Sequence, residues 1–265
     1  MSTPRISGYE LAEFLEGSAE LARLREQAAV VARAELAALR KVGFPRAGRV
    51  LDLGCGPGFF AERLRESEPG LDLTGVDRDP RCVEEARQRI VALVADAERP
   101  LPFPDAHFDA AYARLVLRHL ACPRTALDEL FRVVRPGGLI VAIDGDDGAL
   151  VLSPEPDGFE LALRARQRGV RRRGADPLFA RRLPALLRGI GCEGVTLEPL
   201  VVDSISIGAA AFARIVLLPI TDAIDEDLLP RAQLEAAAAS VRTWGEREGV
   251  FGMTTALVVA GRKPA

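Results

Sequence analysis

The chain is predicted to fold as an α/β protein with a mostly parallel sheet covered by helices on both faces. Between Arg49 and Asp144, short apolar runs alternate with segments of helical periodicity. Gly, Pro and Asp residues bound these runs, as expected for the strands of βαβ units. The chain has 265 residues, of which 48% are hydrophobic, and this is enough for one large core.

The elements of this first part follow in a regular order. An amphipathic helix over 19–42 precedes the core, because its apolar residues recur at helical spacing and the sequence GFP then ends it. Strands are expected at 49–54, 71–77, 91–96, 108–114 and 138–144, with helices at 59–66, 80–90 and 125–134.

The pattern changes after Asp147. Helices are expected at 153–173 and 177–189, a strand at 193–204, a partly polar helical stretch at 208–248, and a final strand at 254–263. Phe212, Ile215, Leu217 and Leu218 either line an apolar site or pack on the sheet, and packing is the favoured interpretation. Trp244, the single tryptophan, is expected to anchor this region.

Charge and cysteine content narrow the class of partner. The net charge is −3 without a long block of one sign, so a nucleic-acid partner is not expected and a small molecule is. The four cysteines, at 55, 82, 122 and 192, lack metal-ligand spacing, and no metal site is expected. No signal peptide or membrane span is recognised, which predicts a soluble, cytoplasmic protein, monomeric or homodimeric, without a membrane partner.

The stretch VLDLGCGPGFF places Gly54, Gly56 and Gly58 between a predicted strand and a predicted helix. Without Cβ atoms, such a turn can be tight and a ligand can approach its backbone closely. The dinucleotide pattern G-x-G-x-x-G does not fit, because the third glycine comes one position too early, and no P-loop motif occurs.

Acidic residues follow the next two predicted strands. Asp77 ends the second strand about 20 residues beyond the glycines, the spacing at which a carboxylate binds a ribose diol. Asp96 and Ala97 follow the third strand, where a side-chain oxygen and a backbone amide could bind an adenine. Together these features predict a site for an adenosine that lacks a 2′-phosphate.

The succession Asp52-x-Gly54-x-Gly56-x-Gly58, Asp77, Asp96, Asp109 and LFRVVRPGG resembles class I S-adenosylmethionine-dependent methyltransferases of the ubiquinone/menaquinone-type small-molecule branch. The resemblance is strong over about residues 48–147. It implies a Rossmann-like sheet of seven mostly parallel strands with an antiparallel last strand, helices on both faces and a helical cap. It further implies methyl transfer from S-adenosylmethionine, producing S-adenosylhomocysteine, and secondary metabolism as the setting.

The same resemblance implies three parts within a single domain. These are an N-terminal helical lid over 1–45, a cofactor-binding core over 46–150, and, over 151–265, the remaining core strands with helical insertions that cap the substrate. It also assigns cofactor contacts. The residues implied to bind S-adenosylmethionine are Asp52, Gly54, Cys55, Gly56, Gly58, Asp77, Arg78, Asp96, Ala97 and Arg114, together with Tyr9, Arg23 and Gln27 from the lid.

Two residues are candidates for acting on the acceptor. His119 follows the fourth strand, at the sheet edge where α/β proteins bind ligands, and could serve as a general base or simply pack at a helix start. Asp144 ends the fifth strand and is the second candidate. The alternative interpretation is that Asp144 belongs to a solvated loop and has no role toward the acceptor. A magnesium site at Asp144, Asp146 and Asp147 is not expected, because no matching ligand lies in register.

Arginines cluster at 164, 166, 168, 171, 172 and 173. A solvated helix face is the favoured interpretation, although one of them could face inward and bind an anionic group of the acceptor. Two other functions stay open in principle: a protein that binds S-adenosylmethionine without transferring its methyl group, and an NAD-linked oxidoreductase. The second lacks the expected catalytic Tyr-x-x-x-Lys pair.

Overall fold

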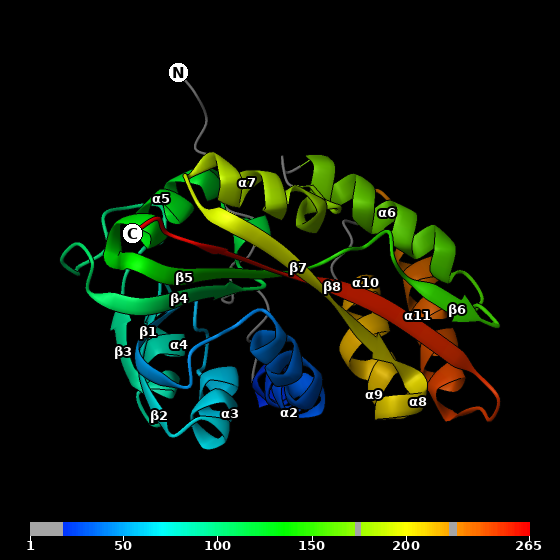
Figure 1. Ribbon diagram of the computed structural model, residues 1–265. Coiled ribbons are helices and arrows are strands. Elements are labelled where there is room, and N and C mark those ends of the chain that lie inside the picture. The colour runs from blue at the N-terminus through cyan, green and yellow to red at the C-terminus, as the bar shows by residue number, and fades with distance from the viewer. Residues whose placement is uncertain (1–17, 173–175, 223–226) are drawn as a thin grey trace.

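The computed structural model describes residues 18–172, 176–222 and 227–265. Its centre is an eight-stranded sheet in the order β3-β2-β1-β4-β5-β8, with β6 and β7 also paired to β8 (Figure 1). The strands are β1 (Ala47–Leu53), β2 (Gly70–Asp77), β3 (Val91–Val94), β4 (Phe108–Arg114), β5 (Val134–Gly145), β6 (Val151–Ser153), β7 (Glu193–Asp203) and β8 (Phe251–Arg262). The first five run parallel, and β8 runs antiparallel to β5 and β7.

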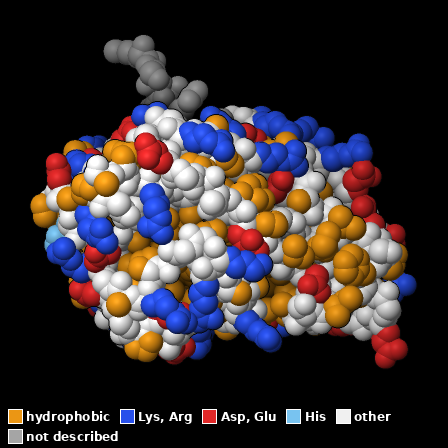
Figure 2. Space-filling view, in the orientation of Figure 1, with side chains coloured by type: hydrophobic (Ala, Val, Ile, Leu, Met, Phe, Trp, Pro, Cys, Tyr) orange, Lys and Arg blue, Asp and Glu red, His pale blue; other side chains and the backbone are white. Residues whose placement is uncertain are grey.

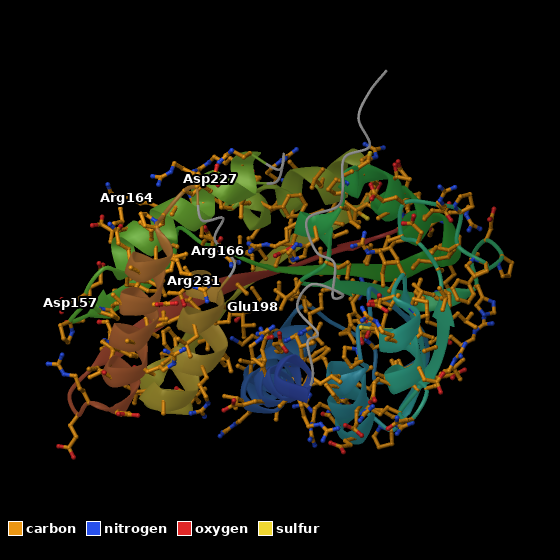
Figure 3. All side chains as sticks on the ribbon, turned by 180° about the vertical axis from the view of Figure 1, so that it is seen from behind. Asp157, Arg164, Arg166, Glu198, Asp227 and Arg231 are labelled. Atoms are coloured by element: carbon orange, nitrogen blue, oxygen red, sulfur yellow. The ribbon has the colours of Figure 1, made fainter. Side chains whose placement is uncertain are left out.

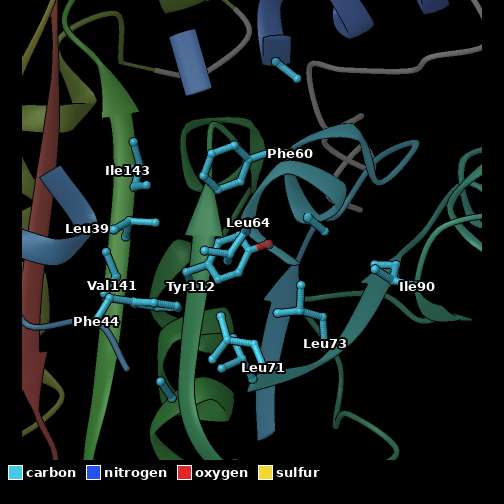
Figure 4. Close-up of a cluster of buried hydrophobic side chains, with 14 of the residues drawn as sticks. Leu39, Phe44, Phe60, Leu64, Leu71, Leu73, Ile90, Tyr112, Val141 and Ile143 are labelled. Carbon is cyan, nitrogen blue, oxygen red and sulfur yellow. The ribbon is translucent and has the colours of Figure 1, made fainter. Parts of the chain in front are cut away.

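Two layers of helices bury the two faces of the parallel strands. One layer contains α2 (Ser18–Lys41), α3 (Phe59–Ser67) and α4 (Pro80–Ala86), and the other contains α5 (Pro123–Val133) and α7 (Leu183–Gly189). Successive residues of one strand point to opposite faces, so Val50 joins the first layer and Leu51 the second. In the first layer, Phe44 and Phe60 pack edge-on against Tyr112 (Figure 4).

The remaining helices pack around the extended ends of β7 and β8, beyond the parallel strands (Figure 1). They are α6 (Phe159–Arg172), α8 (Ser204–Ile207), α9 (Ala209–Phe212), the π-helical turn η3 (Ala213–Leu217), α10 (Leu218–Asp222) and α11 (Arg231–Glu246). Trp244 is 1% exposed, packs against Phe212 and donates its indole N–H to the Pro154 carbonyl at 2.7 Å. It therefore ties α11 to the segment after β6.

The predicted α/β fold class is confirmed, but the sheet has eight strands instead of seven, because the short strand β6 also pairs with β8. Further differences lie in the second half of the chain. The helix expected from Ser153 begins at Phe159, because Ser153 closes β6 and two prolines follow it. The helical stretch expected over 208–248 is divided into α9, η3, α10 and α11, with Pro230 directly before α11. Phe212, Ile215 and Leu217 are buried in the packing of these short helices, as favoured from the sequence.

Candidate functional site

The candidate site lies where the carboxyl ends of β1, β2 and β4 meet, because ligands of open α/β sheets bind at this edge, where the strand order reverses. The glycine turn between β1 and α3 occupies this point. Gly54, Gly56 and Gly58 all have positive φ angles, of 72°, 52° and 78°. The turn is held against β2 by the Gly54 N–H, which donates to the Val76 carbonyl at 2.8 Å.

The glycines of this turn serve two different purposes. A Cβ on Gly54 would lie 2.5 Å from the Val116 Cγ2, so Gly54 lets the turn pack against the segment after β4. A Cβ on Gly56 would meet no atom of the described residues within 4 Å. The backbone at Gly56 is therefore open to a ligand.

Asp77 extends from the end of β2 to the same place. Its Oδ2 accepts the Gly56 N–H and its Oδ1 accepts the Asp79 N–H, both at 2.9 Å. Burial raises the pKa of Asp77, while these two backbone donors act in the opposite direction. The carboxylate is thus fixed beside the open glycine, and each oxygen retains a lone pair for a further donor.

Asp96 and Ala97 follow β3, one strand further along the same edge. The Asp96 Oδ1 accepts the Glu98 N–H at 2.9 Å, and its Oδ2 lies 3.5 Å from the Arg99 Nε. The Asp96 side chain is 43% exposed and Ala97 is half-buried. Arg78, which follows Asp77, is exposed. The sequence-predicted residues of β2 and β3 therefore share one edge of the sheet.

Asp52 lies near the end of β1 and Cys55 lies within the turn, and the two side chains differ in exposure to solvent. Asp52 is 3% exposed, and its Oδ2 accepts the Tyr112 hydroxyl at 2.7 Å. Burial raises the pKa of Asp52 to about 7. Burial also raises the pKa of Cys55 well above its usual range, so this half-buried thiol stays protonated near neutral pH.

Arg114, at the end of β4, forms a contact that sequence analysis missed. Its Nε donates to the Glu35 Oε1 of α2 at 2.8 Å, and its guanidinium lies 4.9 Å from the centre of the Phe60 ring. Glu35 is only 2% exposed. The available signal was its position in the helical repeat, because Glu35 falls on the same face as the buried Val31 and Leu39.

Of the lid residues, Arg23 and Gln27 lie on α2, where the Arg23 Nη1 donates to the Gln27 Oε1 at 3.4 Å. Tyr9 lies outside the described residues. The cofactor contacts assigned to these three residues stay predictions.

Asp144 is not free to act on a substrate in this structure. It is 1% exposed, and its Oδ1 lies 2.6 Å from the Arg118 Nε. Burial raises the pKa of Asp144 to about 6, and the Arg118 guanidinium opposes that rise, so the pair is ionic at neutral pH. Arg118 also donates to the Asp147 Oδ1 at 3.0 Å and to the Gly145 carbonyl. Arg118 was another residue that sequence analysis did not single out.

The third acidic side chain of this loop is paired as well, since the Asp146 Oδ2 accepts from the Arg181 Nε at 2.7 Å. Within the described ranges, no group of three or more His, Cys, Asp or Glu side chains is arranged to hold a metal ion.

His119 lies on the turn η1 (Leu117–His119) that follows β4. Burial, followed by the charges of Arg118, Arg166 and Arg78, lowers the pKa of His119 to about 3. The imidazole is therefore neutral across the physiological range. It can accept a hydrogen bond there, but a conjugate acid this strong makes it a weak general base.

Arg166 faces inward, unlike its neighbours on α6 (Figure 3). Its side chain is 21% exposed and donates to the Pro219 carbonyl at 2.7 Å, with Asp147 4.0 Å away. Arg164 and Arg172, whose side chains are 66% and 57% exposed, pair with Glu160 and Asp227 on the surface. Figure 2 shows basic side chains gathered along the edge formed by α6 and α7. Over 164–172 the arginine run is mostly a solvated face with one inward member, and Arg173 lies outside the described residues.

Comparisons with known proteins agree with this architecture. Residues 51–142 match the family model described as a methyltransferase domain. A ubiquinone/menaquinone biosynthesis C-methyltransferase of Desulfotalea psychrophila is 38% identical over 109 residues, which cover 39% of this chain and 44% of that protein. A malonyl-[acyl-carrier protein] O-methyltransferase of Serratia marcescens is 41% identical over 96 residues, which cover 35% and 36%. The chain thus spans less than half the length of these curated relatives.

The fold is also that of a solved structure. An S-adenosylmethionine-dependent methyltransferase of Thermotoga maritima superposes with a TM-score of 0.56 at 21% identity, covering 96% of each chain. Among the described helices, none is long and apolar enough to cross a membrane.

Proposed function

Because residues 51–142 form a class I S-adenosylmethionine-dependent methyltransferase domain, we propose that this chain transfers the methyl group of S-adenosylmethionine to a small organic acceptor. The observation that carries the proposal is the open backbone at Gly56, with the Asp77 carboxylate hydrogen-bonded beside it. An adenosine needs such a place, where a ribose diol can donate to a fixed carboxylate and no side chain blocks its approach.

The residues present fit this cofactor. Asp77 would accept from the ribose hydroxyls, and Asp96 with Ala97 would contact the adenine from the end of β3. Gly54, Cys55, Gly56 and Gly58 would face the ribose and the methionine portion, and Arg78 would lie beside the adenosine. Asp52 would support the methionine amine, with Tyr112 holding its carboxylate in place. When bound, the cofactor supplies an electrophilic methyl group on a sulfonium.

The chain's own contribution to the reaction is alignment and exclusion of water, because in-line displacement depends on how well the nucleophile is oriented. The pair Arg118–Asp144 fixes η1 against β5, and η1 carries His119 at the edge of the site. Neutral His119 would orient an acceptor hydroxyl or amine by accepting its hydrogen bond. With its lowered pKa, it suits an acceptor that is already a good nucleophile.

We assign three parts to this function. Residues 1–45 would form the lid and residues 46–150 the cofactor-binding core. Residues 151–265 would supply the remaining core strands, with α6 and α8 to α11 as the cap that selects the acceptor. The family match ends at residue 142, so the cap lies outside it. The two relatives described above are named for methylation of different atoms, carbon and oxygen. The shared domain therefore does not define the acceptor, and we assign its selection to the cap. Secondary metabolism is the proposed setting of the reaction.

The proposal is tested by calorimetric titration of the full chain with S-adenosylmethionine, S-adenosylhomocysteine and NAD. Wild-type protein should bind the first two saturably and not NAD. Asp77→Ala should lose both interactions, whereas the matched control Asp72→Ala, at an exposed position of the same strand, should retain them. Binding of NAD alone, or of no nucleotide, would contradict the proposal.

Turnover separates methyl transfer from simple cofactor binding. Production of S-adenosylhomocysteine should depend on an added acceptor from a panel of phenols, amines, thiols and carbon acids. Cofactor binding without turnover on such a panel would favour the alternative of a binding protein, or of an enzyme that uses the same cofactor for another reaction.

A further inference from the structure

The contact between α2 and the end of β4 is an incomplete ion pair. The Arg114 Nε and the Glu35 Oε1 are 2.8 Å apart. The side chains are 15% and 3% exposed, so the pair is largely shielded from water. In the two-bond geometry common for arginine and carboxylate, a second nitrogen would meet the second oxygen.

That second bond is not made here. The Glu35 Oε2 and the Arg114 Nη2 are both closed to solvent, and neither has a hydrogen-bond partner among the described residues. A buried charged donor and acceptor that stay unpaired lower the stability of the protein. Such an arrangement is retained where a ligand supplies the missing hydrogen-bond partners. The orphaned atoms are one anionic acceptor and one cationic donor, carried by neighbouring side chains.

The pair lies at the glycine turn. Arg114 follows Ala113, whose Cα is the register partner of Leu53 on β1, and Gly54 comes directly after Leu53. The Arg114 guanidinium lies over the ring of Phe60, in the first turn of α3. Asp52, also at this place, already accepts the Tyr112 hydroxyl. Glu35 is thus the buried carboxylate here with a wholly unused oxygen among the described residues.

We propose that Glu35 and Arg114 bind the amino-acid end of the cofactor as a zwitterion. The Glu35 Oε2 accepts one N–H of the α-ammonium group, in addition to the support proposed from Asp52, and the Arg114 Nη2 donates to the α-carboxylate. An α-amino acid carries these two groups on one carbon, which matches an acceptor and a donor carried by two side chains that contact each other. The inference rests on the proposed function and adds Glu35 as a specificity-determining residue supplied by α2.

Both atoms are shielded from solvent, so the ligand reaches them only when α2 lifts from the end of β4. Closure of α2 over the bound ligand would then complete the two bonds. This gives α2 a direct role in cofactor recognition, in addition to its packing on α3 and the sheet.

The test compares two ligands that differ in the amino-acid group. S-Adenosylhomocysteine carries it, and 5′-methylthioadenosine is a nucleoside thioether without it. Calorimetry with wild type and Glu35→Gln should show a loss of about 10- to 100-fold in affinity for S-adenosylhomocysteine, as expected for a hydrogen bond between charged groups. Affinity for 5′-methylthioadenosine should change by less than about twofold.

Two further variants make the result decisive. Glu26→Gln removes another α2 ion pair, with Arg214 of η3, and should leave both affinities unchanged. Arg114→Lys keeps the positive charge but has no second nitrogen, and should show the same selective loss as Glu35→Gln. It also serves as the independent variant if Glu35→Gln fails to fold, which circular dichroism would reveal.

The outcomes are distinguishable. Equal losses for both ligands would mean that Glu35 and Arg114 only hold α2 in place, and an unchanged affinity for S-adenosylhomocysteine would mean that they do not contact it. Either result overturns the inference and leaves the proposed function standing. If wild-type protein binds neither ligand, the proposed function itself is wrong, and the inference falls with it.

Discussion

The two halves of the molecule hold their functional side chains by different means. In the half built on β1 to β5, these side chains lie at or just beyond strand ends, and several are fixed by backbone donors, as Asp77 is by Gly56 and Asp79. In the half built from α6 and α8 to α11, Arg166 and Trp244 donate to backbone carbonyls of other segments, those of Pro219 and Pro154. Strand ends give positions that follow from local sequence, whereas the cap depends on how short helices pack.

Arg118 holds η1 to the end of β5 and to the loop that follows it, and its removal should produce the largest effect. Arg118→Met leaves Asp144 buried without its counter-charge and also removes the Arg118 contact with Asp147. We expect a loss of about 3–5 kcal/mol in the free energy of unfolding, measured by urea denaturation, because a buried charge without a partner is strongly destabilising. The double variant Arg118→Met/Asp144→Leu should recover part of the loss. A loss below about 1 kcal/mol for the single variant would contradict a structural role for this pair.

Asp52 should make the stability of the cofactor half depend on pH. The folded protein holds the Asp52 proton up to a pKa of about 7, whereas the unfolded chain releases it near pH 4, so stability falls as pH rises between these values. Asp52→Asn removes this dependence. The variant should gain about 2–3 kcal/mol relative to wild type between pH 5 and pH 8 in ligand-free urea denaturation.

The control for this titration is Asp72→Asn, at an exposed position on β2, which should follow the wild-type profile. A constant difference between Asp52→Asn and wild type across the pH range would show that Asp52 is ionised in the folded protein throughout.

The two glycines of the turn should separate folding from binding. Gly56→Ala places a Cβ in open space at a positive φ, so it should cost about 1 kcal/mol of stability yet weaken S-adenosylhomocysteine binding by at least about tenfold. Gly54→Ala also brings a Cβ to 2.5 Å from Val116 and should destabilise more, by about 2–3 kcal/mol. Thermal denaturation and calorimetry measure the two effects. Unchanged binding by Gly56→Ala would place the cofactor elsewhere.

The smallest effect is expected on the outer face of the cap. Arg164→Ala removes a surface ion pair with Glu160 and should change stability by less than about 0.5 kcal/mol. Arg166→Ala, two residues later on the same helix, loses the bond to the Pro219 carbonyl and should cost about 1–3 kcal/mol. Urea denaturation of both variants checks the contrast. Equal effects would mean that the inward position of Arg166 has no energetic consequence.

Most of the parallel sheet and the candidate cofactor residues could be predicted from the sequence. Strand ends, glycines and acidic residues recur there at fixed spacings, because a βαβ unit brings successive strand ends to one edge of the sheet. The prediction was less accurate over 153–173 and 208–248, where prolines divide helical periodicity into short pieces. Periodicity alone does not mark where one short helix gives way to the next.

The sequence by itself determined the chemistry of the turn, since Gly56 and Asp77 act through backbone geometry and a carboxylate that neighbouring segments position. Only the tertiary structure decided the states of Glu35, His119 and Asp144. Glu35 meets Arg114 across 79 positions of sequence. Burial beside three arginines keeps the His119 imidazole neutral. The Asp144 carboxylate forms an ion pair with Arg118. Desolvation and charge pairing depend on which side chains packing brings together, and a linear motif does not contain that information.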